Sequence, residues 1–161
     1  MLHLDFRRHP ISGTAGVARI VLDIVPENDA YEPNDHPDTP AAISLGETVS
    51  GQVLEPWVNA IDDYSEDWFS IDLVQGTATF EFLSVPDEAR IGVRRLSATN
   101  QSVNIVNTGP GEFPTTQFSV PATGTYRFGL EPYAGIIVES FASGAKPSYL
   151  SEQYSFVITQ P

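Results

Sequence analysis

The chain of 161 residues contains no cysteine. A fold without cysteine has no disulfide bond, no thiol nucleophile and no cysteine-ligated metal. Apolar runs long enough to span a membrane are also missing, and residues 1–13 lack the apolar core of a signal peptide. Basic residues are scarce, with eight Lys and Arg against 21 Asp and Glu and a formal charge of −13. That charge repels nucleic acids and anionic membranes, and it suits calcium or a salty extracellular setting.

The chain does have enough apolar residues for a core, since 41% of its residues are hydrophobic. Strong long amphipathic helices are absent, and short alternating runs are separated by Gly, Pro and Asn turns, which is typical of an all-β protein. The pattern predicts an antiparallel β-sandwich of roughly eight to ten strands in two packed sheets. Strands are expected at residues 17–25, 48–53, 67–73, 77–83, 89–96, 102–106, 116–120, 124–130 and 153–159.

The run "DWFSIDL" shows the alternation most clearly, with Phe69, Ile71 and Leu73 on one face. It is followed by "VQGT", which we interpret as a hairpin turn around Gly76 leading into the next strand. Acids on the opposite faces of such strands, Asp72 among them, are expected to be solvated.

Two segments fall outside this rhythm. Residues 1–29 are expected to form an N-terminal arm or linker, which either ends a preceding domain or completes the sandwich of residues 30–161. Residues 132–152 lengthen the connection between the last two clear strands and carry the aromatic residues Tyr133, Phe141 and Tyr149. Exposed rings can stack on sugars or pack on peptide backbones, but a ring in such a place more often covers the rim of the core.

Oxygen-bearing side chains gather in two short loops. The turn "YEPNDHPDTP" (31–40) cannot be a regular helix, because proline removes a backbone donor and restricts the preceding residue. The loop "AIDDYSEDWF" (60–69) comes just before a strand. Calcium takes six to eight oxygen ligands, and a cation relieves the repulsion among crowded carboxylates. Together the loops offer Glu32, Asn34, Asp35, Asp62, Asp63, Glu66 and Asp67.

Either these loops are simply solvated, or they form a hard-cation site. None of these seven residues is a histidine or a cysteine, which zinc and copper prefer as ligands, and magnesium favours a smaller and wetter site. The EF-hand pattern is absent.

A resemblance carried by several motifs favours the cation site. In order along the chain, they resemble the bacterial pre-peptidase C-terminal domain, which is related to the collagen-binding domains of clostridial collagenases. The resemblance covers about residues 30–160 and rests on "YEPND" (31–35), "AAISLGETVSGQV" (41–53), "EDWFSIDL" (66–73), "TGTYRFGL" (123–130) and "YSFVIT" (154–159).

This resemblance implies a jelly-roll-like sandwich with calcium bound where the linker meets the sheet. It implies Glu32, Asn34 and Asp35 as ligands from the linker and Asp67 as a ligand from the strand. Trp68 and Phe69 would be structural, one in the core and the other packed over the edge.

The chain departs from the family pattern at two positions. Ala30 and Ser65 stand where relatives tend to carry acids. Asp63 or Asp62 would substitute for Ser65, and Asp29 lies near the first position but out of register. The resemblance therefore leaves open whether one or two ions bind.

Catalysis is not expected. The histidines are His3, His9 and His36, and neither H-E-x-x-H nor G-x-S-x-G occurs. Glu81, like Asp72, is expected to face solvent rather than to form a glycosidase pair.

Two functions from different classes remain. The first is a non-catalytic, calcium-binding accessory domain that assists a neighbouring domain of a secreted or cell-surface bacterial protein. The second is a module that binds an extracellular polysaccharide or protein through residues 132–152. The lack of cysteine alone fits a cytosolic protein equally well.

Overall fold

The computed structural model describes residues 29–52, 66–87, 89–96, 102–132 and 152–161. In these ranges the chain forms nine strands and no helix, so none of the described residues forms a helix that could cross a membrane. The strands are β1 (Ala41–Ala42), β2 (Thr48–Gly51), β3 (Asp67–Leu73), β4 (Gly76–Ser84), β5 (Ile91–Leu96), β6 (Ser102–Asn107), β7 (Thr115–Val120), β8 (Gly124–Pro132) and β9 (Tyr154–Thr159).

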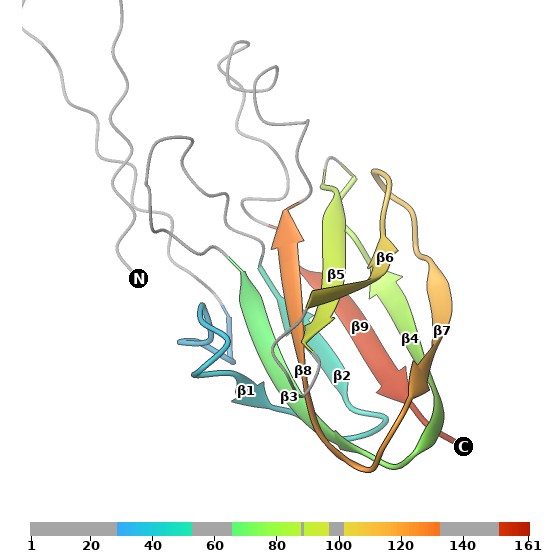
Figure 1. The fold of residues 1–161 in the computed structure, drawn as a ribbon. Helices are drawn as coiled ribbons and strands as arrows, with labels where there is room; N and C mark the ends of the chain where they lie inside the picture. Colours follow the sequence, from blue (N-terminus) through green and yellow to red (C-terminus); the bar gives the residue numbers. More distant parts are fainter. Residues whose placement is uncertain (1–28, 53–65, 88, 97–101, 133–151) are drawn as a thin grey trace, which may run out of the picture.

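The strands form two sheets (Figure 1). One has five strands in the order β1-β3-β8-β5-β6, and the other has four in the order β2-β9-β4-β7. Neighbouring strands are antiparallel except β1, which pairs with β3 in parallel. The prediction of an all-β sandwich is confirmed.

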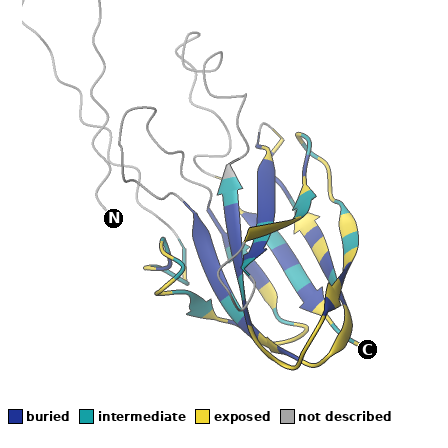
Figure 2. Cartoon of the chain, viewed as in Figure 1, coloured by how far each residue is buried: buried dark blue, intermediate teal, exposed yellow. Residues whose placement is uncertain are grey.

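The core lies between the two sheets, where inward side chains of both sheets meet. Figure 2 shows buried residues along the strands of both sheets. Phe69 of β3 packs edge-on against Phe156 of β9, with ring centroids 5.3 Å apart. Phe156 in turn stacks on Phe80 of β4 at 4.9 Å. These contacts follow from the period-two alternation, which directs every second residue of each strand inward. Burial of these rings supplies a large share of the folding free energy.

The predicted hairpin between residues 67–73 and 77–83 is wrong. β3 pairs with β1 and β8, whereas β4 pairs with β7 and β9, so the turn at Gly76 carries the chain from one sheet to the other. The crossing is fixed by Gln160, whose side chain accepts a hydrogen bond from the Val74 amide and donates one to the Val74 carbonyl oxygen. Alternation tells which face of a strand is buried, but it does not tell which strand lies beside it.

Several predictions lie outside the described residues. They are the strand at 17–25, residues 1–28 of the N-terminal arm, and nearly all of the 132–152 segment with Tyr133, Phe141 and Tyr149. Asp62 and Asp63 lie outside as well.

Candidate metal centre

Three carboxylates converge at one end of the sandwich. Asp29 and Glu32 lie on the segment that precedes β1, and Asp67 is the first residue of β3. One carboxylate oxygen from each residue lies within 4.8 Å of the other two. Figure 1 shows why this is feasible, because the segment before β1 runs beside the start of β3.

Asp29 fastens this segment to the second sheet. Its Oδ1 accepts a hydrogen bond from the amide of Tyr31 at 2.8 Å, which closes the local turn. Its Oδ2 accepts another from the amide of Gln52 at 3.1 Å, just after β2 ends. Glu32 makes a similar local bond, since its Oε2 accepts from the Asn34 amide at 3.2 Å. These hydrogen bonds hold the carboxylates of Asp29 and Glu32 in place without a bound ion.

Asp67 is the most buried of the three carboxylates. Its exposed fraction is 5%, and it accepts a hydrogen bond from the hydroxyl of Tyr154, which is wholly buried. Tyr154 stands opposite Gly51 in the β2–β9 pairing. A β-carbon at position 51 would clash with the Tyr154 hydroxyl and lie 2.7 Å from the Asp29 Oδ2, so only glycine admits this approach.

The electrostatics of the cluster oppose ionisation of Asp67. Burial raises the pKa of Asp67 well above its usual range, and the charges of Asp29, Glu32 and Asp35 raise it further, while the Tyr154 hydrogen bond lowers it. Burial, followed by the charge and hydrogen bond of Asp67, likewise raises the pKa of Tyr154. A positive charge placed among these carboxylates would relieve the repulsion.

Asn34 adds an unusual buried group beside the acids. Its residue is 0% exposed, and its carbonyl oxygen accepts a hydrogen bond from the Trp68 amide at 2.9 Å. Neither its side-chain oxygen nor its side-chain nitrogen has a hydrogen-bond partner among the described residues. A buried amide without partners is costly, so it calls for an explanation.

The proline-rich turn is docked firmly on the sandwich. The ring of Tyr31 packs edge-on against Phe69, with centroids 5.6 Å apart, and its hydroxyl donates to Glu47 at 2.9 Å. Further along the turn, the Arg127 guanidinium donates to the carbonyl oxygen of Pro37 at 2.8 Å. These contacts fix the segment that carries Glu32 and Asn34.

The structure thus brings together part of the set expected from sequence. Glu32 and Asp67 meet, and Asn34 lies beside them. Asp35 is half-buried and close enough for its charge to raise the pKa of Asp67. Asp29, expected to be out of register, is a member of the group.

Sequence reasoning missed Tyr154 and Gly51. Both follow the ordinary strand pattern, in which Tyr154 reads as a core ring. A tyrosine at an inward position still needs a partner for its hydroxyl, and that requirement is the signal that could have pointed to a polar group nearby.

Among the described residues, Asp72, Glu81 and His36, which were considered for catalysis, do not gather into a site. Asp72 and Glu81 are exposed, as expected, and they lie on different sheets. His36 is exposed in the turn, where its Nδ1 accepts a hydrogen bond from the Asp38 amide at 3.1 Å.

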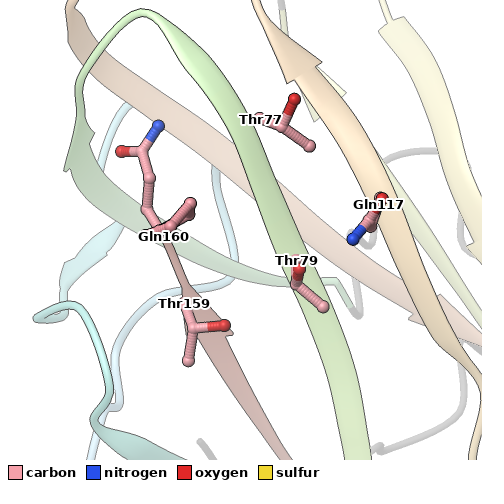
Figure 3. Close-up of a pocket in the computed structure, with 6 residues that line it drawn as sticks. Thr77, Thr79, Gln117, Thr159 and Gln160 are labelled. Atoms are coloured by element: carbon pink, nitrogen blue, oxygen red, sulfur yellow. The ribbon is translucent and has the colours of Figure 1, made fainter.

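A concave feature away from the carboxylate group lies on the outer face of the four-stranded sheet (Figure 3). It is an open depression of about 560 Å³ whose described lining has no titratable side chain. The residues that line the depression occupy outward polar positions, which are expected of a sheet with one solvated face. The lining residues are Thr77, Thr79, Gln117, Thr159, Gln160 and Pro161.

Comparisons with known proteins bear on the fold. No family model and no curated protein matches the chain. Among solved structures, the chain is similar to CorA of Methylomicrobium album BG8, described as a surface-associated copper-binding protein important in copper acquisition. The TM-score is 0.52 at 9% identity, over 76% of this chain and 98% of CorA.

The pre-peptidase C-terminal domain of the collagenase from Bacillus anthracis is also similar. Its TM-score is 0.44 at 10% identity, over 73% of this chain and 92% of that domain. The solved structures similar to this chain therefore include a member of the family that its motifs resemble. Identities this low compare folds, and they assign no role to any residue.

Proposed function

We propose that residues 30–161 form a non-catalytic, calcium-binding accessory domain of a secreted or cell-surface protein. The supporting observation is the group formed by Asp29, Glu32 and Asp67, whose carboxylate oxygens lie within 4.8 Å of one another at the junction of the linker and both sheets. The domain would serve a neighbouring domain in a longer chain. This role rests on the motifs, since the likeness to solved structures supports the fold alone.

The residues fit a hard cation. The donors are carboxylates, and the buried Asn34 amide, whose oxygen has no partner among the described residues, is a further oxygen donor beside them. Copper, which the description of CorA names for that protein, prefers imidazole and sulfur ligands. The group of three acids has neither. The ion would be held by Asp29, Glu32, Asn34 and Asp67. The further ligands proposed from sequence are Asp35, Asp62 and Asp63.

The ion would act as a cross-link. Asp29 and Glu32 belong to the segment before β1 and Asp67 belongs to β3, so a shared cation would join that segment to the sandwich while offsetting repulsion among the acids. A ligand that binds only the folded state stabilises it by RT ln(1 + [L]/Kd), about 2.7 kcal/mol at a hundredfold excess over Kd. For a domain of this size that corresponds to a rise in Tm of about 5–10 °C.

A thermal melt in EDTA, in millimolar calcium and in millimolar magnesium tests the proposal. We expect a calcium-selective rise in Tm that Glu32→Gln greatly reduces. Glu81→Gln is the matched control, because it removes the same charge from an exposed position on β4. Equal Tm values in calcium and EDTA would overturn the proposal and leave the turn as an ordinary solvated loop.

A further inference from the structure

The outer face of the five-stranded sheet carries a polar cluster directly behind the carboxylate group. In the strand pairing, Trp68 of β3 stands opposite Gly129 of β8, and Gly129 stands opposite Arg94 of β5. The three residues therefore form one row across three strands. Because successive side chains alternate between faces, the row lies on the face opposite to the inward-pointing Phe69.

The glycine in this row lets the other two residues meet. A β-carbon at Gly129 would lie 2.8 Å from the indole Cζ2 of Trp68, so the ring occupies the space above the glycine. The Arg94 guanidinium then lies over the same indole, with its central carbon 5.1 Å from the ring centroid. Cation–π contacts of this kind strengthen when they are shielded from water, and Trp68 is only 1% exposed.

Arg94 also contacts Glu66, the residue before Asp67 in the sequence. One of its terminal nitrogens hydrogen-bonds both carboxylate oxygens of Glu66, and the two side chains are 27% and 11% exposed. An ion pair this well shielded is screened less than a surface pair. A single guanidinium thus fixes the residue before Asp67 and the residue after it.

The same contacts reach the linker. The Trp68 amide donates to the carbonyl oxygen of Asn34, so the backbone of β3 is tied to the segment that carries Glu32. Holding Trp68 in place therefore holds both Asp67 and the proline-rich turn.

We propose that Arg94 is a positioning residue for the cation site. It contacts Glu66 and Trp68 on the outer face of the sheet, and these contacts fix the Asp67 carboxylate, which would bind the ion on the inner face. The inference rests on the proposed function. Partners that orient metal ligands typically change metal affinity by about 10–100-fold when they are mutated.

The direction in which calcium affinity changes when Arg94 is removed distinguishes a positioning role from a purely electrostatic one. Considered only as a charge, Arg94 repels a cation nearby, so its removal would strengthen calcium binding. Considered as a positioning residue, its removal weakens calcium binding. A role in stability alone would lower Tm in EDTA and leave the calcium Kd unchanged.

Calorimetric titration of the full chain with calcium separates these roles, with Tm in EDTA measured in parallel. We expect Arg94→Gln to raise the calcium Kd about tenfold or more. Arg94→Lys keeps the charge but loses the planar contact with the indole, so we expect an intermediate loss. Arg90→Gln removes the same charge from an exposed residue before β5 and is the matched control, with a Kd expected within about twofold of the wild type.

The outcomes are distinct. Wild-type protein that binds no calcium would refute the proposed function, and this inference with it. Wild-type binding with an unchanged or tighter Kd in Arg94→Gln would overturn the positioning role alone. Should Arg94→Gln fail to fold, Arg94→Lys decides, because a wild-type Kd in that variant contradicts the proposal.

Discussion

At the scale of single residues, Asp67 is a buried acid among other acids. Its ionised form has lost most of its water and faces the charges of Asp29, Glu32 and Asp35. Without a cation this arrangement costs stability at neutral pH, because burial and like charges both favour the protonated form.

Asp67→Asn should therefore stabilise the protein in EDTA and abolish its response to calcium. Asparagine keeps an acceptor for the Tyr154 hydroxyl but carries no charge. We expect the free energy of unfolding at pH 7 in EDTA to rise, because the variant no longer buries a charge among like charges. Urea unfolding with and without calcium measures both effects. A variant less stable than wild type in EDTA would show that the buried charge of Asp67 does not destabilise the metal-free protein.

Glu131 provides a pH dependence of its own. Burial raises its pKa, and the hydrogen bond and charge of Glu66 raise it further, while the Arg94 charge lowers it. The folded state therefore binds a proton more tightly than the unfolded state does. The stability from this group is complete below the unfolded pKa of 4.5 and is lost as pH rises through the folded pKa.

Glu131→Gln should remove this loss. We expect its free energy of unfolding to fall less than that of the wild type as pH rises above 4.5, so the variant gains relative stability toward neutral pH. Urea unfolding across the acidic to neutral range measures the difference. Asp67 titrates in the same direction in both proteins, so the difference reports on Glu131. Parallel pH profiles would refute the expectation.

At the scale of elements, the turn of residues 31–40 depends on Tyr31. Tyr31→Ala removes both the contact with Phe69 and the hydrogen bond to Glu47. We expect a loss of about 1–3 kcal/mol in the free energy of unfolding and faster hydrogen exchange in the turn.

Tyr31→Phe is the matched control. It keeps the ring and should cost only about 0.5–1.5 kcal/mol through the lost hydroxyl. If the two variants exchange hydrogen in residues 31–40 at the same rate, the ring contact is not what holds the turn.

The strands show how far sequence carries at this scale. Alternation predicts the core-facing residues of β3, β4, β8 and β9 correctly, because side-chain alternation is a local property. It does not predict that Trp68, on the other face of β3, is buried as well. The partner of each strand is set by contacts distant in the chain. The bonds from Gln160 to the crossing at Val74 join residues 86 positions apart, which no local pattern reveals.

At the scale of the whole molecule, the carboxylate group is assembled from separate parts of the chain. The motifs anticipated Glu32 and Asp67. Asp29 is brought in by the Gln52 amide, and Tyr154 comes from the last strand. These two contacts depend on how β2 and β9 pair, so the sequence could not place them.

The parallel strand β1 has a consequence for self-association. It has only two residues and lies at the edge of the five-stranded sheet, where it covers one side of β3. If the turn before it were released, the backbone donors and acceptors of β3 would become an open edge, and such edges readily pair with another chain. This short strand and the turn before it therefore also shield part of the edge of β3 from pairing with another chain.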